Sequence, residues 1–150
     1  MLAYLKTYLT QGEQGVNEKQ RSLCRYLAKM ESAQAAEWLI STYPIDSVDY
    51  GEAFWLMSHR SWRRGDQKRL ANYYFKKLPF SGAFGYESFA SFMSTSALLS
   101  CVRARLPMSH ADVELLLYYL VPALKKFAKG QADYQLITDF ATEAQNATLG

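Results

Sequence analysis

Residues 36–45 read AEWLISTYPI, and residues 71–80, thirty-five positions later, read ANYYFKKLPF. Each stretch leads through a polar break to a second apolar segment, EAFWLM at 52–57 and ESFASF at 87–92. Most of the pairs matched at this offset are apolar on both sides, and four are identical: Ala36/Ala71, Pro44/Pro79, Glu52/Glu87 and Phe54/Phe89. A period of this length is typical of stacked two-helix repeats, whose usual role is to bind another macromolecule.

Apolar residues recur at helical spacing through nearly the whole chain. Pro44 and Pro79 are each expected to end a helix, because the residue before a proline is disfavoured in the helical region. Gly65 predicts a left-handed cap, and Pro122 predicts a kink or a split in a longer helix. Helices are therefore expected over residues 2–10, 17–30, 36–43, 49–64, 66–78, 86–105, 109–129 and 134–144.

The expected fold class is all-α, with about eight helices in a single domain over residues 1–150. No stretch shows convincing β alternation between turn signals. Short connections favour antiparallel helical hairpins. The echoed hairpins resemble HEAT-type units, so a short stack of two-helix repeats and an irregular helical bundle both fit the pattern.

The charge of the chain is unevenly distributed. The formal net charge is +3, but the segment from His59 to Lys77 carries +6 and the rest of the chain −3. Asp66 is the one acidic residue of this segment, which contains seven basic residues: Arg60, Arg63, Arg64, Lys68, Arg69, Lys76 and Lys77. Arginine suits carboxylate or phosphate, because its planar fork donates two parallel hydrogen bonds. The segment is therefore expected to form either a basic corner that binds an anionic partner or a solvated helix corner.

Residues for binding a partner are predicted at both ends of the helix expected over 49–64. The acidic candidates lie just before or at its start, and the basic and aromatic candidates lie at its end or in the next expected helix. They are Asp46, Asp49 and Glu52, and Arg60, Trp62, Arg63, Arg64, Lys68 and Arg69.

Recognised catalytic and cofactor motifs are absent from the sequence. It has no phosphate-binding glycine loop, no dinucleotide fingerprint and no zinc-type His-Glu-x-x-His helix. The two cysteines, Cys24 and Cys101, make neither a disulfide framework nor a metal-ligand spacing. We therefore expect no catalytic residue, no metal and no cofactor. Residues 1–9 show no basic leader and no cleavage site, and no apolar run reaches the length that spans a bilayer, so we expect a cytoplasmic protein without a membrane partner.

One spacing suggests chemistry. Arg103 and Arg105 precede His110 at intervals similar to the arginine–histidine spacing of the HEPN family, all-helical domains that include many RNA-cleaving toxins. That resemblance implies an active site in which the histidine exchanges protons and the arginine stabilises phosphate charge. Pro107 departs from the uninterrupted helix that is usual for this family.

The leading functional hypothesis is a non-enzymatic module that binds another protein. Its most concrete form is a small bacterial immunity or antitoxin-like protein that covers a toxin. One alternative is a regulator that binds nucleic acid through the basic corner Arg60–Lys77. The other is a HEPN-like ribonuclease that uses Arg103 or Arg105 with His110.

Overall fold

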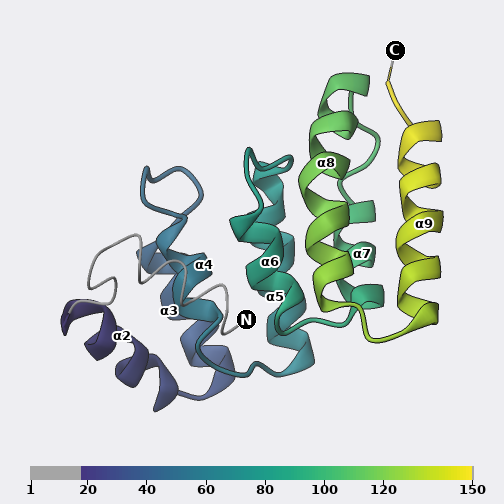
Figure 1. The fold of residues 1–150 in the computed structure, drawn as a ribbon. Coiled ribbons are helices and arrows are strands. Elements are labelled where there is room, and N and C mark those ends of the chain that lie inside the picture. Colours follow the sequence, from purple (N-terminus) through teal and green to yellow (C-terminus); the bar gives the residue numbers. More distant parts are fainter. Residues whose placement is uncertain (1–17, 150) are drawn as a thin grey trace.

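The computed structural model describes residues 18–149 as a stack of helices (Figure 1). This part of the chain contains no strand, only an isolated bridge between Ser109 and Leu149, so the all-α prediction is confirmed. The helix expected over residues 2–10 lies outside the described residues. The eight helices that are described, with a short 3-10 helix (η1) extending the fourth of them, are α2 (Glu18–Ala28), α3 (Ser32–Thr42), α4 (Glu52–Met57), α5 (Arg64–Tyr74), η1 (Phe75–Lys77), α6 (Phe84–Ala90), α7 (Thr95–Arg103), α8 (His110–Phe127) and α9 (Gln131–Asn146).

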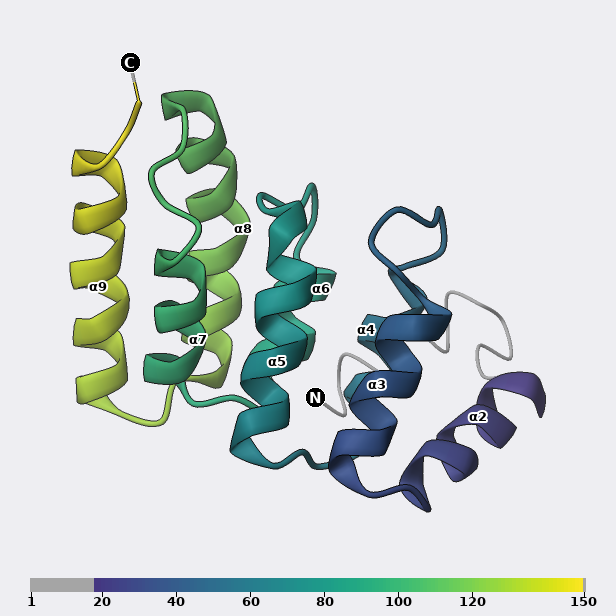
Figure 2. The same cartoon turned by 180° about the vertical axis from the view of Figure 1, so that it is seen from behind.

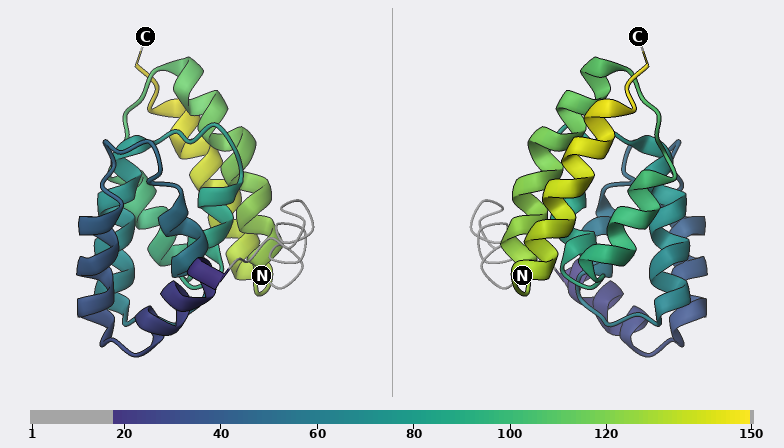
Figure 3. Two further views of the ribbon diagram at one scale, coloured as in Figure 1. Left: turned by 90° about the vertical axis from the view of Figure 1, so that its left-hand side faces the viewer. Right: turned by 90° about the vertical axis from the view of Figure 1, so that its right-hand side faces the viewer.

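The helices form two rows. One row packs in the order α2, α4, α6, α8, and the other in the order α3, α5, α7, α9. Figure 1 faces α6 and α8 of the first row, and Figure 2 faces α3, α5 and α7 of the second. The α8–α9 pair is inclined relative to α3 and α5 when the stack is viewed end-on (Figure 3). Each helix therefore packs mainly against the helices nearest to it in the stack.

The echoed residues occupy matching places in two successive helix pairs. Ala36 in α3 and Ala71 in α5 are both fully buried in the second row. Phe54 in α4 and Phe89 in α6 are buried in the first row, where their ring centroids lie 5.9 Å apart. The echo thus marks equivalent core positions of neighbouring pairs, and a relationship to HEAT-type repeats stays a prediction.

Aromatic rings fill the centre of the stack. The ring of Phe54 packs against Tyr74, Phe80 and Phe89, with centroids between 5.2 and 5.9 Å away. Gly85 lies directly beneath this cluster, because a Cβ there would lie 2.8 Å from the Phe80 ring. Aromatic residues make up 15% of the chain, and they serve mainly the core, which draws on residues from every helix between α2 and α9.

The helix expected over 49–64 is α4 in the structure, and it is shorter than expected. It ends at Met57, because side chains take over its last carbonyl groups. The Ser58 hydroxyl and the His59 Nδ1 both bond to the Trp55 carbonyl oxygen, and the Trp62 indole N–H donates to that of Met57. The prediction of a left-handed cap at Gly65 was also wrong, since Gly65 lies in the first turn of α5.

The segment expected as one helix over 86–105 is two helices. Ser94 has an extended backbone (φ −67°, ψ 152°), and its hydroxyl oxygen accepts a hydrogen bond from the Ala97 N–H. This N-cap starts α7 and separates it from α6.

The helix expected to kink or split at Pro122 is continuous, because α8 runs through Pro122 without a split. Pro122 and Tyr118, whose carbonyl loses its usual donor, are both exposed, so water can replace the missing bond. None of the described helices is long and apolar enough to cross a membrane.

Candidate binding surfaces

The cations of the basic segment do not converge on one corner. Arg60 turns back to α2, where its Nη1 donates to the carbonyl oxygens of Leu27 (2.6 Å) and Met30 (3.0 Å). Its guanidinium also lies 4.6 Å from the centre of the Trp62 ring. Desolvation by burial lowers the pKa of Arg60. Arg60 is therefore a cap for the end of α2, and only its remaining exposed edge can meet a partner.

Trp62 and Arg63 join the α4–α5 connection to the rest of the stack. Trp62 is only 6% exposed and packs in the core. The backbone N–H of Arg63 donates to the Ser32 hydroxyl at the start of α3 (3.0 Å). The side chain of Arg63 is exposed, whereas Trp62 is not available as an aromatic anchor for a partner.

The remaining cations of the segment face three directions. Arg69 forms an ion pair with Glu37 of α3. Lys76 and Lys77, beyond the other end of α5, lie over the rings of Tyr73 and Tyr50 (5.3 and 5.5 Å). Arg64 and Lys68 line a cleft toward α7.

The acidic candidates lie at the opposite end of α4 from the basic ones. Asp46 and Asp49 are in the connection before α4, and Glu52 is its first residue. All three are exposed. Burial, followed by the charges of Glu52 and Asp49, raises the pKa of the nearby Tyr43 hydroxyl. The acidic and basic candidates therefore do not form one continuous surface.

A basic cleft of about 620 Å³ opens between the start of α5, the α6–α7 turn and the end of α8. Its cations are Arg64, Lys68 and Lys129, and no carboxylate lines it. The other lining residues are Gln67, Ala90, Ser91, Phe92, Met93, Ser94, Ser96, Ala97, Ser100 and Phe127. Sequence reasoning found two of the three cations. It missed Lys129, the last residue of the helix expected over 109–129, because the sequence does not show that the end of α8 lies near the start of α5 and the α6–α7 turn.

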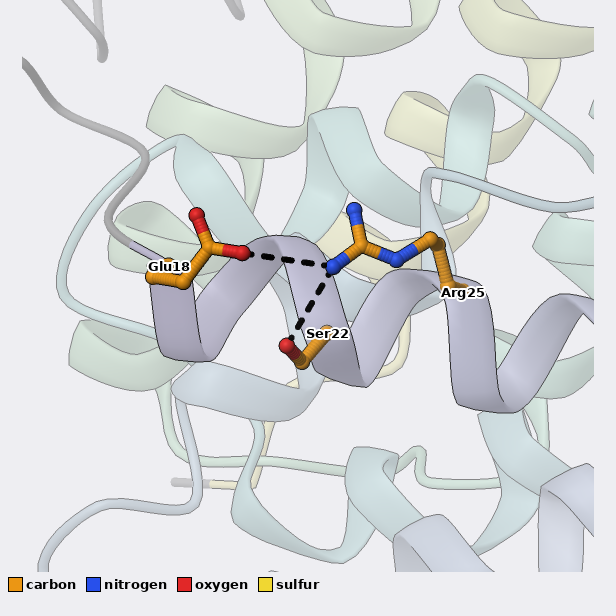
Figure 4. Close-up of polar contacts among 3 residues, drawn as sticks. All are labelled: Glu18, Ser22 and Arg25. Carbon is orange, nitrogen blue, oxygen red and sulfur yellow. Dashed lines mark hydrogen bonds and ion pairs between the residues drawn. The ribbon is translucent and has the colours of Figure 1, made fainter.

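A second feature, the aromatic hollow, is a shallow depression on the outer side of α3. It is lined by Met30, Ala33, Gln34, Glu37, Trp38, Ser41 and Arg69. Tyr26 of α2 adjoins it edge-on to Trp38, with ring centroids 5.7 Å apart, and is 52% exposed. Arg25, the neighbour of Tyr26, is held by Glu18 and Ser22 at 3.4 Å each (Figure 4). Of the predicted residues, the hollow contains only Arg69.

The arginine and histidine of the HEPN-like spacing are held by different carboxylates. Arg103 Nε lies 2.7 Å from Glu143 Oε2 of α9, and the guanidinium packs over the Phe140 ring. His110 Nε2 lies 2.7 Å from Glu114 Oε1 in α8. Between residues 18 and 149 no hydrogen bond or ion pair joins His110 to Arg103 or Arg105, and no cluster of three His, Cys, Asp or Glu side chains could hold a metal.

No protein-family model, curated protein or solved structure matches this chain.

Proposed function

We propose that the chain is a non-enzymatic module that binds another protein through the aromatic hollow. Trp, Tyr, Met and Arg are the residue types enriched where binding energy concentrates in interfaces, and the hollow with adjoining Tyr26 presents all four. Its floor is apolar, and the Arg69–Glu37 pair stands at its rim. The partner therefore presents an apolar side chain to Trp38, with polar groups around it.

The most concrete form of this proposal is a bacterial immunity or antitoxin-like protein that acts in the cytoplasm. A rigid stack of helices supports it, because such a surface binds without a large ordering cost. The dispersal of the basic segment over four directions favours a protein partner over nucleic acid, whose backbone calls for a continuous track of cations.

The experiment blocks the hollow without removing any packed side chain. Ala33 is exposed and is the second residue of α3, and Ala132 is equally exposed and the second residue of α9. Ala33→Arg fills the hollow, and Ala132→Arg is the matched control. Tagged proteins are returned to native-host cells that lack the gene, and co-purifying proteins are quantified by mass spectrometry.

We expect wild type and Ala132→Arg to retain the same stoichiometric partner and Ala33→Arg to lose it. Cells without the gene should be outcompeted by their parent, and only the variants that retain the partner should rescue them. Equal capture by Ala33→Arg would reject the hollow as the binding site. Capture that depends on the hollow, without any growth defect in the cells that lack the gene, would retain the binding module and reject the immunity role.

A further inference from the structure

The basic cleft carries an uncompensated positive charge. Arg64 and Lys68 come from α5, and Lys129 comes from the connection between α8 and α9. Within residues 18–149 no carboxylate lies within 4.0 Å of any of the three side-chain nitrogens, in contrast to Arg25, Arg69 and Arg103. Three cations from two parts of the chain therefore share one cleft whose lining contains no carboxylate; the Asp133 carboxylate, outside the lining, accepts from the backbone N–H of Lys129 (2.9 Å).

Neutral hydrogen-bond donors line the same cleft. Ser94, Ser96 and Ser100 present hydroxyls from the first turns of α7. The Gln67 amide of α5 already donates one N–H to the Trp62 carbonyl oxygen (3.0 Å), which leaves its second N–H. Ser94 accepts from the Ala97 N–H, which leaves the hydroxyl proton of Ser94 free to donate outward. The N–H groups of Thr95 and Ser96 have no acceptor among the described residues, as expected for the first turn of a helix. The positive end of α7 adds to the field of the cations.

We propose that this cleft binds the phosphate group of a small-molecule ligand. A phosphate dianion matches more than one cation, and its tetrahedral oxygens can accept bonds from α5, α7 and Lys129 at the same time. A single planar carboxylate offers only two oxygens and one charge. The cleft volume, about 620 Å³, falls within the range of about 300–1,000 Å³ that is usual for small-molecule sites. Because the other cations of the basic segment face elsewhere, the cleft ends rather than continues as a track for a nucleic acid.

This inference is independent of the proposed function. The aromatic hollow lies on α3 and the cleft on the opposite side of α5, so the two share no lining residue. A failure of one proposal therefore leaves the other standing.

The test titrates the purified full chain with inorganic pyrophosphate without divalent metal, and with citrate at matched charge and ionic strength. Affinity is measured by calorimetry and location by amide NMR shifts. We expect saturable pyrophosphate binding, with the largest shifts at Thr95 and Ser96, and citrate binding at least about tenfold weaker. A 20-nucleotide single-stranded DNA is the third ligand, and we expect it to bind no more tightly than pyrophosphate.

The variants use exposed side chains that make no ion pair within residues 18–149, so folding is preserved and is checked by thermal denaturation. Arg64→Ala and Lys129→Ala should each weaken pyrophosphate binding about tenfold, whereas Arg105→Ala and Lys125→Ala, which lie outside the cleft, should not. Absence of saturable binding, equal losses in all four variants, or citrate binding as tightly as pyrophosphate would overturn the proposal. Tighter binding of the oligonucleotide that depends on Arg64 would replace it with nucleic-acid binding.

Discussion

The hydroxyl of Tyr74 lies 2.9 Å from the carbonyl oxygen of Tyr43, and it shares its proton with the Leu39 carbonyl oxygen 3.2 Å away. Leu39 of α3 and Tyr74 of α5 are matched at the thirty-five-residue offset, so this hydrogen bond joins two helices at a pair of matched positions. The Leu39 carbonyl oxygen also accepts from the Tyr43 N–H (2.8 Å), whereas the Tyr43 carbonyl, just past the end of α3, has no donor within the helix and depends on Tyr74. Burial raises the pKa of Tyr74, which keeps the hydroxyl protonated as a donor.

Removing this hydroxyl should weaken the packing of α5 against the end of α3. Tyr74→Phe leaves the Tyr43 carbonyl buried without its donor, and we expect the free energy of unfolding to fall by about 1–3 kcal/mol. Tyr118→Phe is the matched control, because Tyr118 is 71% exposed. Urea denaturation measures both variants, and equal stability of the two would show that the Tyr74 bond contributes nothing.

Gly85 should tolerate no side chain. Gly85→Ala places a Cβ 2.8 Å from the ring of Phe80 and 3.0 Å from that of Phe54, and we expect overpacking to cost about 1–3 kcal/mol. In Gly65→Ala the new Cβ has nothing within 4 Å, and the helical position favours alanine. Thermal denaturation should therefore show a lower midpoint for Gly85→Ala only. A midpoint as high as wild type would mean that the ring cluster shifts without cost.

Arg60 should stabilise α2 rather than bind a partner. Arg60→Ala removes the donors from the carbonyls of Leu27 and Met30, and we expect a loss of roughly 1–2 kcal/mol. Hydrogen exchange should accelerate in α2 but not in α9. Arg64→Ala is the control, since that side chain is exposed and lines the cleft. Unchanged exchange in α2 would contradict the capping role.

His59 should make stability fall in weak acid. Burial lowers the pKa of His59 below its ordinary 6.5, and the Nδ1 bond to the Trp55 carbonyl only partly offsets this effect. Below pH 6.5 the unfolded chain therefore binds a proton that the folded chain resists, so the free energy of unfolding decreases as the pH falls. His59→Asn keeps a donor near Trp55 but does not titrate. Its stability should depend less on pH between 6.5 and 5 than that of wild type, and equal slopes would remove His59 as the cause.

The sequence contained enough local information to predict the helical fold. The helix expected from residue 109 begins there, since the Ser109 hydroxyl accepts from the Asp112 N–H and caps α8, and α3 ends just before Pro44 as expected. The errors in the helix bounds came from side-chain bonds across a turn and from an unrecognised cap. Trp62 ends α4 by bonding across a turn, and Ser94 starts a helix without the acidic partner of a capping box.

The candidate site was less predictable than the fold. A cluster of cations in sequence fixes the charge of a segment, but not the direction of each side chain. In the structure, Arg60 and Lys76 face different helices although they belong to the same run. Lys129 shares a cleft with Arg64 because the end of α8 lies near the start of α5 and the α6–α7 turn, and no local pattern in the sequence indicates that arrangement.

Each helix packs mainly against adjacent helices, and this arrangement also determines how far the effect of a destabilising mutation extends. When each unit contacts only those beside it, stability is close to a sum of adjacent interfaces rather than the property of one indivisible core. A lesion in α9 therefore leaves the junction of α3 and α5 nearly intact, and one in α2 leaves the junction of α7 and α9. Such a molecule can lose order from its ends inward while its middle units persist, and changes at the two ends are expected to combine additively.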